Sequence, residues 1–173
     1  TQFLPNTDVF QQNHVRSLIY SLRQISFLAM KFHCVVTNPP YLGSRKMYST
    51  TSVWLKENSY TDVSRDLYSA FLKRCIGYSF QDGLISMITQ ISWMFTRDYM
   101  RFRDSFVKEY ELLNALILGS GVFETISGEV VKSCAFLIRK RKSDLTSLFI
   151  DLVSYTNKAK MLSVAKRRYV YLK

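Results

Sequence analysis

Cysteine is scarce in this sequence, and its spacing favours free thiols over a disulfide scaffold or a metal centre. The three cysteines, Cys34, Cys75 and Cys134, lie far apart among apolar neighbours. None belongs to a CxxC or His/Cys pattern of metal ligands. We therefore expect three buried, reduced thiols and no bound metal.

Long apolar runs, a signal peptide and low-complexity tracts are also missing. The longest purely apolar stretches are a handful of residues, whereas a membrane-spanning helix needs roughly 20. The N-terminus lacks the charged and apolar regions of a signal peptide, and no proline, serine or glutamine tract argues for disorder. The sequence thus predicts a folded, soluble, intracellular chain with no membrane partner. It starts at Thr1 rather than Met, which we interpret as an interior cut in a longer protein.

Acidic residues are few beside basic ones. The sequence has 13 Asp and Glu residues and 24 Lys and Arg residues, which gives a formal net charge of +11 over 173 residues. A polyanion such as a nucleic acid is the natural partner of such a chain. The alternative is a basic but merely solvated surface, because charge alone indicates non-specific association.

The spacing of apolar residues predicts alternating helices and strands. Helical spacing covers residues 13–31, a stretch that starts at Asp62, and residues 97–110. We expect Thr61 or Asp62 to cap the second of these helices and Asp82-Gly83 to end it. Strand-like runs cover residues 33–37, 84–93, 112–118 and 130–138, and residues 42–60 have no clear period and are expected to form an exposed loop. This alternation predicts an α/β fold with a parallel sheet that ends in a hairpin-like pair. Ligands of such sheets bind at the carboxyl ends of the strands.

Asn38-Pro39-Pro40-Tyr41 follows the first of these strands directly. The prolines fix the backbone and remove two N–H donors, so the carbonyls near Asn38 and Pro39 become acceptors on a stiff loop. An exocyclic amino group has two N–H bonds, which Asn38 Oδ1 and the Pro39 carbonyl could accept together. The Tyr41 ring offers a face on which a base can stack. Such a site works by positioning and electrostatics and needs no general base before attack.

The alternative for this tetrapeptide alone is a tight turn after a strand. Its context resembles the catalytic half of amino-group methyltransferases. The surrounding sequence is similar to that of the phage-exclusion (BREX) adenine methyltransferases of the PglX type. The segments that carry this similarity are residues 35–44, 66–68, 91–95 and 127–131.

This resemblance implies later strands of a Rossmann-like, S-adenosylmethionine-dependent methyltransferase fold, mostly parallel with an antiparallel terminal strand. It implies S-adenosyl-L-methionine as methyl donor, double-stranded DNA with a flipped adenine as acceptor, and a bacterial, cytoplasmic defence system with further protein partners. It assigns the target base to Asn38, Pro39 and Tyr41, with Pro40 shaping the loop. Residues 1–155 would be the C-terminal portion of the catalytic domain, and residues 156–173 a basic tail that leads to a missing downstream region.

The donor-binding turn of these enzymes lies on an earlier strand, so we expect it upstream of residue 1. A permuted order would instead use Gly119 and Gly121 in the turn 119–123. The preceding strand lacks the usual acidic residue, and Asp151 is the only later candidate for the ribose hydroxyls. We favour a plain connection between two late strands at this turn. Removal of earlier strands would also leave an apolar sheet edge.

Three cations after the tetrapeptide, Arg45, Lys46 and Lys56, are candidates for DNA phosphates, with an ordinary solvated loop as the alternative. His14 and His33 lack partners for a metal or a nucleophile and are interpreted as structural. The cluster Trp93, Met94 and Phe95 is expected in the core rather than in a cofactor pocket.

Two other functions stay open from the sequence. A truncated, catalytically silent remnant could bind nucleic acid through charge alone. An enzyme that methylates RNA or a protein glutamine would use the same Asn-Pro-Pro-Tyr chemistry.

Overall fold

The computed structural model describes residues 9–120, 131–142, 144, 146–154 and 170–172. The chain divides into two units, residues 1–31 and residues 32–173. The first contains one long helix, α1 (Val9–Ala29), as the apolar spacing predicts. Its apolar side chains are exposed, with Leu18 at 62% and Leu22 at 63%.

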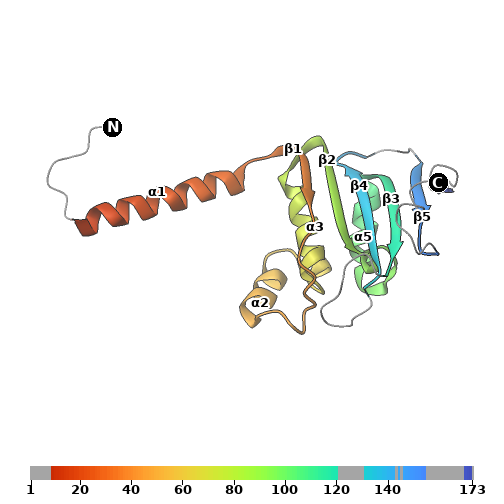
Figure 1. Cartoon of the computed structure of the whole chain (residues 1–173), viewed down its shortest axis with the longest axis horizontal. Helices are drawn as coiled ribbons and strands as arrows, with labels where there is room; N and C mark the ends of the chain where they lie inside the picture. Colours follow the sequence, from red (N-terminus) through yellow and green to blue (C-terminus); the bar gives the residue numbers. More distant parts are fainter. Residues whose placement is uncertain (1–8, 121–130, 143, 145, 155–169, 173) are drawn as a thin grey trace. The chain divides into compact units, whose positions relative to one another are not determined.

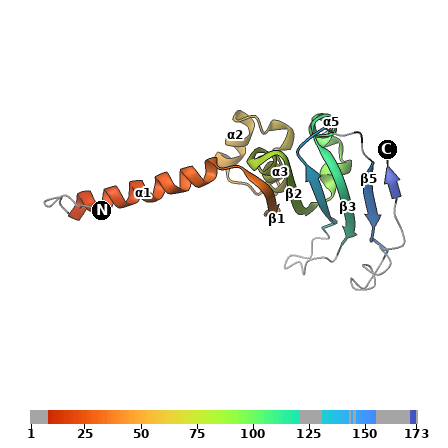
Figure 2. The same ribbon diagram turned by 90° about the horizontal axis from the view of Figure 1, so that it is seen from above.

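The second unit is a six-stranded mixed sheet with helices on one face (Figures 1 and 2). The strands lie in the order β1-β2-β4-β3-β5-β6. The pairs β1/β2 and β3/β5 are parallel, whereas β4 is antiparallel to both of its neighbours and β6 is antiparallel to β5. In chain order the elements are β1 (Phe32–Thr37), α2 (Ser49–Glu57), the 3-10 helix η1 (Thr61–Val63), α3 (Leu67–Tyr78), β2 (Ser79–Gln90), α4 (Ser92–Phe95), the 3-10 helix η2 (Arg97–Tyr99), α5 (Met100–Glu109), β3 (Glu111–Gly119), β4 (Ser133–Arg139), β5 (Ser147–Asp151) and β6 (Val170–Leu172).

The core lies between the sheet and the two helices α3 and α5. Side chains of β2 and β4 alternate between the two faces, so that Ile85, Met87, Phe136 and Ile138 are fully buried on the helix side. The Trp93 ring lies at the centre, edge-on to Phe136 at 5.0 Å and to Phe106 at 5.4 Å between ring centroids. These aromatic contacts fix α4 and α5 against the sheet.

In the part of the chain that the structure describes, the opposite face of the sheet is partly open at β2, whereas Leu152 is buried against Leu116, Leu118 and Ile150. The alternate residues of β2, Leu84, Ser86 and Ile88, are only half-buried. Strand β1 pairs with β2 alone, and its Val36 is 73% exposed. The apolar edge expected from the sequence is therefore present at β1.

The prediction of three buried thiols holds for two of the three cysteines. Cys75 and Cys134 are buried and free, and burial raises the pKa of each thiol to about 11, so both stay protonated near neutral pH. Cys34 is exposed on the edge strand, which contradicts the prediction of three buried thiols. The apolar neighbours that suggested burial alternate across β1, and one of its faces is open.

Four features that the sequence predicts between residues 42 and 93 are wrong. Residues 42–60 are not a plain loop, because α2 occupies Ser49–Glu57 and buries Leu55. Asp66 rather than Thr61 or Asp62 caps α3. Asp82-Gly83 does not end that helix but kinks β2, where Asp82 has a φ of 62°. The predicted strand 84–93 also ends earlier, since Trp93 belongs to α4.

Gly83 lies on β2 close to the backbone of β1, and it gives a test of this packing. A Cβ at this position would overlap the Ser79 hydroxyl and would lie 3.0 Å from the Phe80 carbonyl and 3.2 Å from the His33 carbonyl. We expect Gly83→Ala to lower the free energy of unfolding by about 1–3 kcal/mol in denaturant titrations. Gly77→Ala in α3 is the control, because a Cβ there meets nothing within 4 Å. It should stabilise the chain by about 0.5–1 kcal/mol, and equal effects of the two variants would contradict the packing.

Candidate functional site

The tetrapeptide Asn38-Pro39-Pro40-Tyr41 begins directly where β1 ends at Thr37. Asn38 and Pro40 are exposed, Pro39 is buried and Tyr41 is half-buried. Because β1 and β2 are parallel, the end of β2 at Gln90 and the start of α4 at Ser92 lie at the same edge of the sheet. The tetrapeptide therefore stands at the edge where open α/β sheets bind their ligands.

Tyr41 is anchored at both ends of its side chain. Its hydroxyl donates a hydrogen bond to the Ile88 carbonyl on β2 at 3.3 Å, and its ring meets the Tyr68 ring edge-on at 5.9 Å between centroids. Burial raises the pKa of Tyr41 to about 12, so the hydroxyl stays protonated and remains a donor near neutral pH. The ring is thus held in one orientation and carries no charge.

Tyr68, which supports the Tyr41 ring, is itself fixed from two directions. It is fully buried, its hydroxyl lies 2.8 Å from the Ser92 hydroxyl, and its ring packs against Tyr99 at 6.3 Å. Reasoning from the sequence did not assign these residues to the site. Tyr68 stands in the stretch that carries the family resemblance, but no local signal points to a contact with Ser92, which is 24 residues away.

Asp66 joins the residue after the tetrapeptide to the start of α3. Its Oδ1 accepts hydrogen bonds from the Leu42 amide at 3.0 Å and from the Tyr68 amide at 3.2 Å. Backbone hydrogen bonds continue the connection, from the Leu67 amide to the Leu42 carbonyl at 3.0 Å and from the Ser44 amide to the Arg65 carbonyl at 2.8 Å. Burial raises the pKa of Asp66, and the hydrogen bonds from Tyr68, Leu42 and Leu67 partly oppose that shift. The sequence prediction placed the helix cap elsewhere and missed this residue.

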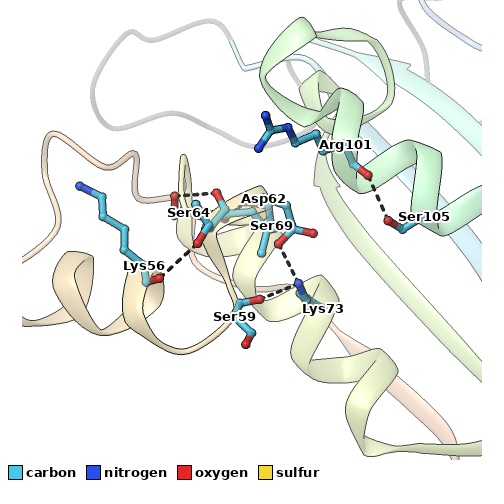
Figure 3. A network of polar contacts seen from close by, with 10 residues as sticks. Lys56, Ser59, Asp62, Ser64, Ser69, Lys73, Arg101 and Ser105 are labelled. Carbon is cyan, nitrogen blue, oxygen red and sulfur yellow. Dashed lines mark hydrogen bonds and ion pairs between the residues drawn. The ribbon is translucent and has the colours of Figure 1, made fainter.

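The structure does not bring the three predicted phosphate-binding cations together. Arg45 and Lys46 are exposed in the turn that follows the tetrapeptide. Lys56 lies at the far end of α2, which alone rises about 13 Å. In Figure 3 its ammonium points away from Ser64 and Asp62, while its backbone carbonyl accepts a hydrogen bond from the Thr61 hydroxyl at 3.1 Å. Arg65, which the sequence reasoning missed, lies beside Ser44 and forms an exposed ion pair with Asp98 at 3.5 Å.

Gly119, the described member of the alternative donor turn, ends β3 with a φ of 72°. A Cβ there would lie 3.4 Å from Val153, so Gly119 packs against this residue. Strands β2 and β4 separate it from β1, a distance of three strand spacings or roughly 14 Å. Gly121 lies outside the described residues.

Trp93 is buried in the core as expected, but Phe95 is 66% exposed. Together with Met94 these residues line a cavity of about 700 Å³ beside α5 and the start of β3. Glu111 also lines it, buried and within 3.6 Å of Arg139 and 3.5 Å of Arg141. Phe95 is therefore not the core residue that the sequence predicted.

No group of three or more His, Cys, Asp or Glu side chains that could hold a metal occurs among the described residues. Within the same residues, no helix is long and apolar enough to cross a membrane.

The fold, with β4 antiparallel between β2 and β3, superposes on S-adenosylmethionine-dependent methyltransferases. A Listeria monocytogenes protein described as a class I enzyme of this kind superposes with a TM-score of 0.57 over 81% of this chain and 43% of its own, at 14% identity. A nuclease-deletion mutant of the Type ISP restriction-modification enzyme LlaGI, solved with a DNA substrate mimic, superposes with a TM-score of 0.63. That match covers 100% of this chain and 16% of the enzyme at 16% identity. The predicted α/β fold class of the S-adenosylmethionine-dependent methyltransferases is confirmed. The sheet is mixed rather than mostly parallel, because β4 is antiparallel to β2 and to β3 inside the sheet and β6 is antiparallel to β5.

The chain belongs to the family of Eco57I restriction-modification methylases, which matches residues 4–123. It is 34% identical over 132 residues to the adenine-specific methyltransferase PglX of Lacticaseibacillus casei (strain Zhang). The match covers 76% of this chain and 11% of that relative, so the chain spans a small part of the protein to which it is similar. The resemblance predicted from the sequence is confirmed.

The buried tyrosines predict how stability depends on alkaline pH. Burial raises the pKa of Tyr41 and of Tyr110 to about 12, above the value of about 10 in an unfolded chain. Above pH 10 the unfolded chain loses protons that the folded chain keeps, so the free energy of unfolding should fall from about pH 10 towards pH 12. Denaturant titrations across this range measure the slope. Tyr41→Phe should make it shallower, whereas Tyr48→Phe, at an 81% exposed ring, is the control. A flat profile in the parent chain would contradict the burial of these hydroxyls.

Proposed function

We propose that this chain carries the target-base half of a bacterial DNA adenine N6-methyltransferase. The observation that supports this most directly is the loop Asn38–Tyr41 at the carboxyl end of β1, with Tyr41 anchored to β2 and to Tyr68. Membership of the Eco57I methylase family and the identity with PglX support the choice of adenine in DNA as acceptor.

Asn38 and Pro39 would bind the exocyclic amino group of the adenine. Asn38 Oδ1 and the Pro39 carbonyl accept its two N–H bonds, which draws both protons out of the ring plane and frees the nitrogen lone pair for attack. As the nitrogen bonds to the methyl carbon, the bond from that carbon to the sulfur of the donor would break with its electron pair going to sulfur. The nitrogen would then carry the positive charge, which the same two oxygens stabilise. One of its protons then leaves to water, which restores a neutral amine. Pro40 keeps the loop stiff, because it fixes φ and has no N–H to donate.

The Tyr41 ring would stack on the adenine. Its anchored orientation means that little conformational freedom is lost when the base binds. The adenine must leave the duplex first, at a cost of a few kcal/mol that stacking and the two hydrogen bonds offset. Because Tyr41 stays protonated near neutral pH, it is not the base that takes the proton from the methylated amine.

Double-stranded DNA is the proposed macromolecular partner. Arg45 and Lys46 are exposed next to the base-binding loop and would contact phosphates of the strand that carries the adenine. Lys56, at the other end of α2, would contact a phosphate farther along. The net charge of +11 supports this partner. A bacterial cytoplasmic defence system with other protein components is the proposed setting.

S-adenosyl-L-methionine is the proposed methyl donor, and we propose that its site is not the turn 119–123. Gly119 packs against Val153, far from Asn38 along the sheet. We propose that upstream strands hold the donor and extend the sheet from the unpaired edge of β1. Residues 1–155 are then the later part of a catalytic domain, and residues 156–173 lead into a downstream region.

Asn38→Ala tests the base site. We expect methyl transfer to duplex DNA to fall by about 100-fold or more, since one of two charge-stabilising acceptors is lost. The measurement uses this chain joined to the donor-binding half of the L. casei relative. Asn58→Ala is the matched control, because Asn58 is also exposed and only bonds locally to the Trp54 carbonyl. Equal rates for the two variants would contradict the proposal, and transfer to RNA or to peptide glutamine instead of DNA would correct its substrate.

Calorimetric titration of this chain alone with S-adenosyl-L-methionine tests the location of the donor site. We expect no heat of binding, because the proposed donor residues lie upstream. Binding that disappears in Gly121→Val would contradict this and would assign the donor to the turn 119–123, making the chain a compact permuted enzyme. Binding that survives Gly121→Val would place the donor site elsewhere in the chain.

A further inference from the structure

We propose that Asp66 is the residue that positions Tyr41 and the base-binding loop, and that binding of the target adenine depends on its hydrogen bond to the Leu42 amide. This inference rests on the proposed function. Asp66 touches no reacting atom in this scheme, so it is a positioning residue rather than a catalytic one.

One carboxylate oxygen of Asp66 binds two chain segments at once. Oδ1 accepts from the Leu42 amide at 3.0 Å and from the Tyr68 amide at 3.2 Å, although these residues are 26 positions apart. The residue is only 9% exposed, so water competes weakly for this oxygen. Hydrogen bonds to an ionised acceptor are about twice as strong as neutral ones. A helix cap needs the Tyr68 contact alone, and the Leu42 contact is therefore additional.

Asp66 contacts both residues that position Tyr41, Leu42 and Tyr68. Leu42 follows Tyr41 in the chain, and its amide is held by Asp66. Asp66 also holds the amide of Tyr68, whose ring supports the ring of Tyr41 at 5.9 Å. Both the backbone and the ring of Tyr41 are therefore positioned from the start of α3.

The other carboxylate oxygen of Asp66, Oδ2, lies close to the loop at Gly43. Oδ2 lies 3.7 Å from the place where a Cβ on Gly43 would stand, and Gly43 forms an isolated antiparallel bridge with Asp66. The loop therefore lies against Asp66 over Leu42 and Gly43. A shorter side chain at position 66 could still cap α3 but could not span this contact with the loop.

The test compares two serine variants that change the net charge equally. Asp66→Ser keeps an N-cap oxygen for the Tyr68 amide and removes the reach to Leu42. Asp62→Ser, four positions earlier, removes the ion pair with Lys73 at 2.7 Å and leaves the loop contacts alone. Both variants remove one negative charge. At constant salt they should therefore change non-specific DNA affinity by the same factor.

The probe is a single-stranded thymidine oligonucleotide with one central adenine. A matched strand carries N6,N6-dimethyladenine, which has no exocyclic N–H to donate. We expect the parent chain to bind the adenine strand about tenfold more tightly than the matched strand. Asn38→Ala and Asp66→Ser should both reduce this preference to about twofold or less, whereas Asp62→Ser should keep it.

Amide hydrogen exchange separates positioning from a general structural effect. In Asp66→Ser the Leu42 amide should exchange faster while the Tyr68 amide stays protected. Asp66→Asn, which keeps an oxygen in place of Oδ1, should keep both the adenine preference and the Leu42 protection. If Asp66→Ser does not fold, Asp66→Thr has the same capping chemistry and replaces it.

Each outcome has one meaning. A folded variant that loses Leu42 protection and keeps the full adenine preference would overturn the role of Asp66 and leave the proposed function intact. Absence of any adenine preference in the parent chain would overturn the base site itself, and the role of Asp66 with it. Loss of the preference in Asp66→Ser but not in Asp62→Ser supports the inference.

Discussion

The parallel pairing of β1 with β2 is the constraint on which the candidate site depends. It brings the ends of two strands to one edge of the sheet, so that Ile88 near the end of β2 meets the hydroxyl of Tyr41. The connection between the two strands ends in α3, and the start of α3 contacts the loop that follows β1. A change of register between these strands would move the Ile88 carbonyl away from Tyr41 and release the ring.

The helix-side core holds this edge in place from below. Trp93 packs against Phe106 of α5 and Phe136 of β4, and it follows directly on Ser92, whose hydroxyl meets Tyr68. The site thus depends on aromatic packing that lies outside it. The outward residues of β2 are only half-buried, and a smaller cluster around Leu152 packs with Leu116, Leu118 and Ile150 of β3 and β5. The packing that supports the site is therefore on the helix side of the sheet.

Much of the fold could be predicted from the sequence, because its signals are local. Alternating and helical apolar spacing gave β1, α3, β2, α5, β3 and β4 in the right order. The prolines identified where β1 ends. The boundaries failed where tertiary contacts decide: α2 buries only Leu55, which is too little for a clear period, and the cap of α3 is the aspartate that also binds the loop. Tyr41 meets Ile88, which is 47 residues away, and Tyr68, whose hydroxyl partner Ser92 is 24 residues farther on. No local pattern encodes these contacts or the strand order. The roles of Asn38, Pro39, Pro40 and Tyr41 stay predictions.

The chemistry proposed for this site depends on how rigidly the loop Asn38–Tyr41 is held. Reactivity by charge would need a side chain whose pKa lies near neutrality, yet burial moves the pKa of Tyr41 away from neutrality, to about 12. What the loop offers is a set of acceptors whose positions are fixed, and fixed acceptors stabilise charge without reorganising when it develops. The prolines remove internal freedom from the loop, and Asp66 and Tyr68 remove its freedom relative to the sheet. A loop of identical sequence without these contacts would carry the same acceptors but would lose part of their effect to its own motion.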